Sequence, residues 1–150
     1  MKYAHTIVIT EFIKKDESLL AAQEALKKLM PFDLAQEKIT LQEKNATGFN
    51  EQPIKILTLT LTKETHTTKF LAFFVSKLST EQKKLLLAQK ESRTDNHLHF
   101  FIRIDKEQWN KEQKILLVDH GNCIHFSISL AAYPAQRTHA LTLVEKIFEE

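Results

Sequence analysis

The 150-residue sequence predicts an α+β fold, with one antiparallel or mixed β-sheet and with helices packed on one of its faces. Three observations lead to this prediction. Several segments alternate apolar and polar residues with a period of two, as half-buried strands do. Other segments repeat apolar residues at helical spacing, and the two kinds follow in the order β-α-β-β-α-α-β-β-β-α. Because no repeat, linker or low-complexity tract divides the chain, residues 1–150 are expected to form a single domain.

The first half of the chain begins with a strand at residues 3–13, which are rich in β-branched and aromatic types. Asp16 is expected to cap the helix that follows, and Pro31 stops that helix. Alternation and a loop composition then predict a hairpin with three parts: a strand at 37–44, a loop at 45–52 and a strand at 54–63.

The clearest strand lies at residues 96–106, NHLHFFIRIDK. The residues expected on its inward side are Leu98, Phe100, Ile102 and Ile104. Those expected on its outward side are His97, His99, Phe101, Arg103 and Asp105. This outward side is either an unusual solvated face or a recognition surface. In the second interpretation, a ring flanked by cationic groups on an open sheet stacks a nucleobase and holds its phosphate.

Other elements flank this strand. Ser79 and Gln82 have the form of a capping box, which predicts a helix over 80–90. A helix-turn-helix DNA reader is disfavoured, because this helix carries lysines but no arginine. The other predicted elements are a helix at 68–78, a helical turn at 106–112, strands at 115–118 and 123–131 with a hairpin turn between them, and a last helix opened by Pro134. In the strand at 123–131, Ile124, Phe126 and Ile128 are expected inward, and His125, Ser127 and Ser129 outward.

The composition excludes several classes of protein. With two glycines in the whole chain there is no Gly-rich phosphate loop, which excludes P-loop and Rossmann sites. No apolar run is long enough to span a membrane, and the start of the chain has the pattern of a strand rather than a signal peptide. The single Cys123 cannot form an internal disulfide, which fits the reducing cytoplasm. A formal charge of +2 permits nucleic-acid binding through a local patch without requiring it.

The seven histidines raise the question of a metal site. His97 and His99 share one outward strand side, and His125 has matching parity on a later strand. Zinc needs a third or fourth ligand and supporting hydrogen bonds, and no Cys cluster or His-Glu motif supplies them. A Gly-x-Ser-x-Gly turn for a nucleophile is also absent. We therefore expect no metal, no cofactor and no catalytic residue.

Three short segments resemble an archaeal protein family. They are RIDKE at 103–107, which HFF precedes, AYPAQR at 132–137, and GFNEQPI at 48–54. The last departs from the family pattern, because Glu51 and Gln52 stand where a second glycine is typical. The family is described as RNA-binding or exosome-subunit-related, and its fold is similar to that of ribosomal protein L-five. The resemblance implies a non-enzymatic, cytoplasmic, RNA-binding protein with that fold.

The leading hypothesis is a non-catalytic RNA-binding protein that acts in RNA processing or ribosome assembly. Its candidate RNA contacts are Arg103, Lys106, Arg137, Phe101 and His99. Only three arginines are present, and a planar guanidinium suits phosphate, while a ring such as Phe101 can stack a base. Three alternatives remain open. The arginines pair with carboxylates such as Asp105, the same face binds a protein within an RNA-processing complex, or a histidine-based site hydrolyses a substrate.

Overall fold

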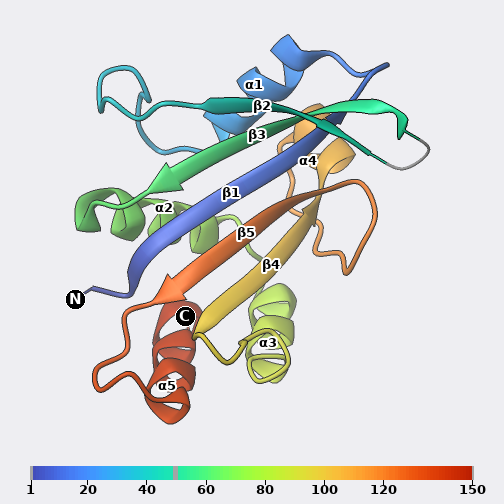
Figure 1. Ribbon diagram of the computed structural model, residues 1–150. Helices are drawn as coiled ribbons and strands as arrows, with labels where there is room; N and C mark the ends of the chain where they lie inside the picture. The colour runs from blue at the N-terminus through green and yellow to red at the C-terminus, as the bar shows by residue number, and fades with distance from the viewer. Residues whose placement is uncertain (1, 49–50, 150) are drawn as a thin grey trace. The chain divides into compact units, whose positions relative to one another are not determined.

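A computed structural model describes residues 2–48 and 51–149 (Figure 1). Its elements, in chain order, are β1 (Ala4–Lys14), α1 (Leu19–Lys28), β2 (Gln42–Thr47), β3 (Pro53–Leu61), α2 (Glu64–Ser76), α3 (Thr80–Ala88), β4 (His99–Asp105), α4 (Lys106–Glu112), β5 (Cys123–Leu130) and α5 (Arg137–Phe148). In this part of the chain, no helix is long and apolar enough to cross a membrane.

The strands form one sheet in the order β2-β3-β1-β5-β4. In Figure 1 the arrows of neighbouring strands run in opposite directions, and β2 pairs with β3 in an antiparallel register from Gln42 opposite Thr58 to Thr47 opposite Pro53. The predicted α+β class is therefore confirmed, and of the two sheet types that were open the antiparallel one is correct.

The chain divides into two compact units, and the division falls inside β1, β4 and β5 and before the last residue of β3. The first unit consists of Met1–Ile7, Leu61–Ile102 and Phe126–Glu150, and the second of Val8–Thr60 and Arg103–His125. The expectation of a single domain over residues 1–150 stays a prediction.

The core of the first unit is aromatic. Phe126 of β5 lies against two rings of α2, with centroid distances of 5.8 Å to Phe70 and 5.2 Å to Phe74. Phe100 of β4 and Phe148 of α5 form a second pair at 5.7 Å. All five rings are buried, and each contributes about 2 kcal/mol through the apolar surface that it removes from water. The inward parity predicted for β4 and β5 is what places Phe100 and Phe126 in the core.

The core of the second unit is anchored by Trp109 on α4. Its indole Nε1–H donates a hydrogen bond of 2.8 Å to the carbonyl oxygen of Ala25 on α1, so the buried ring leaves no polar atom unsatisfied. Ile9 and Ile13 of β1 and Leu57 of β3 are also buried there. The helical turn predicted over 106–112 is confirmed.

The strand predicted at 96–106 begins three residues late, at His99. Leu98 adopts a left-handed backbone with φ of 63° and is half-buried. Just before it, the carboxylate of Asp95 accepts hydrogen bonds from the N–H groups of His97 and His99, which makes a tight turn. His97 therefore does not share a strand face with His99, and the expectation that it does is wrong. The other inward residues predicted for β4 and β5 are buried as expected.

Several other boundaries differ from the prediction. The strand expected at 37–44 starts at Gln42, because hydrogen-bonded turns and a left-handed Lys38 occupy the residues before it. Its last three residues lie in the predicted loop 45–52, of which residues 49 and 50 are outside the described residues. The strand expected at 115–118 is only a single bridge between Leu117 and Ile104, because Gln113 turns left-handed at the end of α4.

The helices are confirmed with shifted ends. Ser18, not Asp16, caps α1 by accepting a hydrogen bond from the N–H of Ala21. The helix expected at 68–78 begins earlier, at Glu64, whose carboxylate suits a helix N-terminus. The last helix begins three residues after Pro134. The capping box of Ser79 and Gln82 is present as predicted.

Candidate nucleic-acid interface

The second unit carries a polar sheet face built from three neighbouring strands. Buried residues on β1, β5 and β4 alternate with residues that are exposed or half-buried, which places the latter on the side away from the core. We call the following five residues of the second unit the outer face: Phe12, Lys14, Cys123, His125 and Arg103.

Arg103 lies on the outer face as the sequence predicted, and it is half-buried. Burial lowers the pKa of His125, and the positive charge of Arg103 lowers it further. His125 is therefore a neutral imidazole near pH 7, with one donor and one acceptor nitrogen. Burial raises the pKa of the Cys123 thiol, although the charge of Arg103 opposes this, so the thiol is not an activated nucleophile.

Lys106 lies in the interior rather than on the outer face. Its side chain is 3% exposed, and Nζ donates hydrogen bonds to the carbonyl oxygen of Phe12 at 2.9 Å and to the carboxylate of Glu17. Lys106 is the first residue of α4, so the chain has already left the alternation of β4. The predicted contact between Lys106 and RNA gains no support from this position, because water and solutes do not reach its ammonium group.

Glu11 lies close to Lys106 and is completely buried. In the part of the chain that the structure describes, neither of its carboxylate oxygens has a hydrogen-bond partner. Burial raises the pKa of Glu11 to about 7, although the charge of Lys106 opposes the rise. Glu11 is thus an acid that is half-protonated near neutral pH.

Arg137 is the first residue of α5, and its guanidinium bonds to backbone. Nη1 donates to the carbonyl oxygen of Thr94 at 2.9 Å and, more distantly, to that of Asp95, while Nη2 donates to that of Glu91 at 2.6 Å. These acceptors follow α3, so Arg137 ties the segment after that helix to the start of α5. The suggested pairing of Arg137 with a carboxylate does not describe these bonds, whose acceptors are carbonyl oxygens.

Phe101 and His99 stack on each other in the first unit, with their ring centroids 6.2 Å apart and the planes inclined by 24°. The carbonyl oxygen of Phe101 accepts a hydrogen bond from Nη1 of Arg93 at 3.1 Å, and the N–H of Phe101 donates to the carbonyl oxygen of Arg93. Arg93 was not among the predicted site residues, and its contacts support the start of β4.

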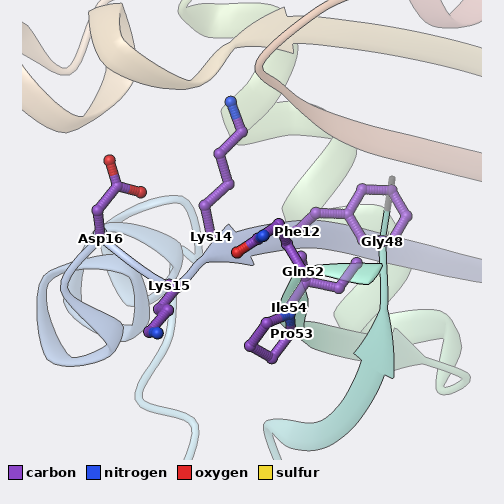
Figure 2. A pocket seen from close by; sticks show the side chains of 8 residues that line it. All are labelled: Phe12, Lys14, Lys15, Asp16, Gly48, Gln52, Pro53 and Ile54. Carbon is purple, nitrogen blue, oxygen red and sulfur yellow. The ribbon is translucent and has the colours of Figure 1, made fainter. Parts of the chain in front are cut away.

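The sequence reasoning missed Phe12, the outward residue of β1 whose side chain is 53% exposed. It borders a cavity of about 840 Å³ (Figure 2). The lining residues are Phe12, Lys14, Lys15, Asp16, Gly48, Gln52, Pro53 and Ile54. A signal was present in the alternation of β1, because Ile9, Glu11 and Ile13 share the inward parity and leave Phe12 outside.

Within residues 2–48 and 51–149, no group of three or more His, Cys, Asp or Glu side chains is placed to hold a metal ion. His97, one of the three histidines weighed as ligands, is exposed in the turn before β4, whereas His99 is half-buried on that strand.

Known proteins match this chain over nearly its whole length. An RNA-binding protein of Pyrococcus abyssi is 26% identical over 147 residues, which cover 97% of this chain and 94% of that protein. A solved structure of a DUF54 protein from Archaeoglobus fulgidus has a TM-score of 0.85 and is 24% identical in sequence. The match covers 96% of this chain and 99% of that protein chain. Another DUF54 structure, from Methanothermobacter thermautotrophicus, has a TM-score of 0.78 at 26% identity. The match covers 97% of this chain and 98% of that protein chain.

A family model described as RNA binding matches residues 6–130. This range contains most of β1, the strands β2 to β5 and the whole outer face, and it ends before Arg137. Since the match spans most of the sequence, the chain belongs to this RNA-binding family.

Proposed function

We propose that this protein binds RNA without catalysing a reaction on it, and that Arg103 on the outer face contacts RNA phosphate. The observation that carries the proposal is the position of this guanidinium. It projects from β4 beside the neutral imidazole of His125 on β5, and Phe12 on β1, the next strand along, adds an exposed ring to the same face. An open sheet with a cation and an aromatic ring suits single-stranded RNA, whose bases are available for stacking.

The other four predicted RNA contacts have different roles in this proposal. Phe101 and His99 offer a stacked pair of rings in the first unit. Lys106 and Arg137 act structurally, because their cationic groups are engaged by Glu17 and by backbone carbonyl oxygens, respectively. Membership of an RNA-binding family and the name of the relative from Pyrococcus abyssi support RNA as the partner.

The finer parts of the proposal rest on the family resemblance in the sequence. They are a role in RNA processing or ribosome assembly, an exosome-related association, a fold similar to ribosomal protein L-five, and action in the cytoplasm. A non-enzymatic role is supported by the unactivated Cys123 and by the names of the relatives, which describe binding rather than a reaction.

The test is a salt series of affinities for a single-stranded RNA oligonucleotide. We expect Arg103→Ala to bind more weakly at low salt and to lower the slope of log affinity against log salt by about 0.7, the value for one phosphate contact on a single strand. Lys28→Ala is the matched control, because Lys28 is an exposed cation of the same unit that lies on α1. Equal slopes for Arg103→Ala and the control would exclude the phosphate contact.

A second candidate function is a protein-interaction subunit of an RNA-processing complex, and the exposed ring of Phe12 favours it. Such an interface would tolerate salt, because apolar burial rather than counterion release would drive it. Wild-type protein that binds no RNA at any salt concentration would favour this second function. A hydrolase would require turnover of a substrate, which a separate activity assay detects.

A further inference from the structure

We propose that the cavity beside Phe12 binds one unstacked base of a single-stranded RNA, and that Lys14 and Lys15 hold the phosphates on either side of that base. The inference rests on the proposed RNA binding and adds a specific subsite to it. The cavity lies within the second unit, at the end of β1 and beside the β2–β3 hairpin (Figure 2).

The size and lining of the cavity suit a nucleobase. Its volume of about 840 Å³ lies in the usual range for small-ligand sites, which is roughly 300–1,000 Å³. Phe12 supplies an aromatic ring, and Pro53 and Ile54 supply aliphatic surface. Figure 2 shows the ring of Phe12 extending toward Gly48, and Lys14 and Lys15 projecting to opposite sides of the strand end. A planar base can therefore stack on the ring while its backbone passes the lysines.

Exposure of Phe12 supports a binding role more than a packing role. More than half of its side chain meets water, whereas the residues on either side of it, Glu11 and Ile13, are buried. A ring that is already exposed gains apolar burial only when a partner covers it. Covering it with a base would remove this apolar surface from water and add a stacking contact.

The charges at the cavity favour an anionic partner. Lys14 and Lys15 are exposed, and Asp16 is the only acidic residue among those that line the cavity. Two ammonium groups and one carboxylate leave a net positive site, which complements the negative charge of a phosphodiester. Because every nucleotide carries one phosphate, a base and its own phosphate would satisfy the ring and a lysine together.

Hydrogen bonds to Lys106 and Glu17 hold the backbone that carries Phe12 and the lysines in place. Nζ of Lys106 donates to the carbonyl oxygen of Phe12 at 2.9 Å. The carboxylate of Glu17 accepts from that same Nζ and from the N–H of Lys14 at 2.8 Å. These bonds hold the end of β1 and the turn after it in one geometry, so binding would order little backbone. Lys106 thereby acts as a positioning residue for the subsite and does not itself touch the RNA.

The first experiment measures affinity for a single-stranded RNA oligonucleotide and for the matching duplex. We expect Phe12→Leu to weaken single-strand binding by about five- to 150-fold, the effect of losing one stacked base, and to leave duplex binding nearly unchanged. Phe12→Tyr keeps a ring and should bind like wild type. Tyr133→Leu is the matched control, because Tyr133 is an aromatic residue that is 95% exposed in the first unit.

The second experiment tests the lysines by their salt slopes. The double variant Lys14→Gln/Lys15→Gln should lower the slope by about 0.7 for each phosphate that the protein no longer neutralises, whereas Lys27→Gln/Lys28→Gln on α1 should not change it. Photocrosslinking of wild-type protein with 4-thiouridine-substituted RNA is a third readout that needs no variant. It should label a peptide that contains Phe12 or Ile54.

The outcomes separate the subsite from the proposed function. If wild type binds single-stranded RNA while Phe12→Leu and the Lys14/Lys15 variant bind like it, or if crosslinks appear only elsewhere, the subsite is wrong and RNA binding stands. If wild type binds no RNA, the proposed function fails and the subsite fails with it. Loss of single-strand affinity in Phe12→Leu, with recovery in Phe12→Tyr, supports the subsite.

Discussion

The ammonium group of Lys106 lies 2.9 Å from a carboxylate oxygen of Glu17, although the two residues are 89 positions apart in the sequence. This pair sits where β1 ends and α4 begins, so it joins the two chain segments of the second unit. Glu17 is 30% exposed while Lys106 is almost completely buried. The ion pair is therefore partly shielded from water, unlike a surface contact.

Replacing Lys106 by Met should destabilise the protein by about 1–3 kcal/mol. Removing one partner of a fully buried pair costs more than this, and the partial exposure of Glu17 lowers the figure. Urea denaturation at pH 7 measures the change, with Lys28→Met as an exposed control that should cost less than about 0.5 kcal/mol. The salt slope of RNA binding should not change. A fall in that slope would mean that Lys106 contacts phosphate or that its loss displaces Lys14 and Lys15 from the subsite, and a further fall in the triple variant with Lys14→Gln/Lys15→Gln would indicate direct contact.

Glu11 should make the free energy of unfolding depend on pH. Its pKa in the folded protein is raised from 4.5 to about 7, so below pH 4.5 both states are protonated and this contribution to stability is fully present. As pH rises from 4.5 through about 7, the unfolded state ionises first and stability falls, by about 3 kcal/mol in full. Glu11→Gln cannot ionise, so its stability should not fall in this window.

The measurement for Glu11 is the difference in the free energy of unfolding between wild type and Glu11→Gln. Urea denaturation gives this difference at each pH from about 4 to about 8. Taking the difference cancels the histidines that both proteins share. Glu17 acts with the opposite sign: burial opposes its charged form, but the N–H of Lys14 and the ammonium of Lys106 outweigh this and lower its pKa. Its contribution is present above pH 4.5 and is lost only as pH falls further. Parallel curves for the two proteins would contradict the raised pKa of Glu11.

Arg137→Ala should destabilise the protein by about 1–2 kcal/mol, because charged hydrogen bonds to the carbonyl oxygens of Glu91 and Thr94 are lost at an exposed site. Arg137→Lys keeps the positive charge but lacks the planar guanidinium with its several donors, so it should recover only part of this stability. Thermal denaturation measures both variants. If Arg137→Lys instead restores full RNA affinity that Arg137→Ala has lost while both remain folded, Arg137 contacts phosphate.

Arg103→Gln should raise the pKa of His125, because the positive charge of Arg103 lowers it in the folded protein and burial alone would then remain. Titration of the imidazole proton signals by NMR measures the shift. An unchanged His125 would mean that the two side chains are not neighbours on the outer face.

Local patterns were enough to predict the core of β4 and β5. Phe100, Ile102 and Phe126 are buried because a strand turns every second side chain to the same side, and this rule needs no distant partner. The capping box at Ser79 is equally local, since both of its hydrogen bonds join Ser79 to Gln82. The prediction fails where a local turn competes with the pattern, as at Asp95, whose carboxylate holds the chain before His99.

The sequence by itself determined the fold class, the inward residues of the main strands and the presence of Arg103 on a polar strand face. Only the tertiary structure decided which partners the predicted cations find. Lys106 and Arg137 look like Arg103 in the sequence, yet their partners lie 94 and 43 residues away, at Phe12 and Thr94. Lys106 becomes buried while Arg137 stays exposed, and no local pattern encodes where such distant partners will lie.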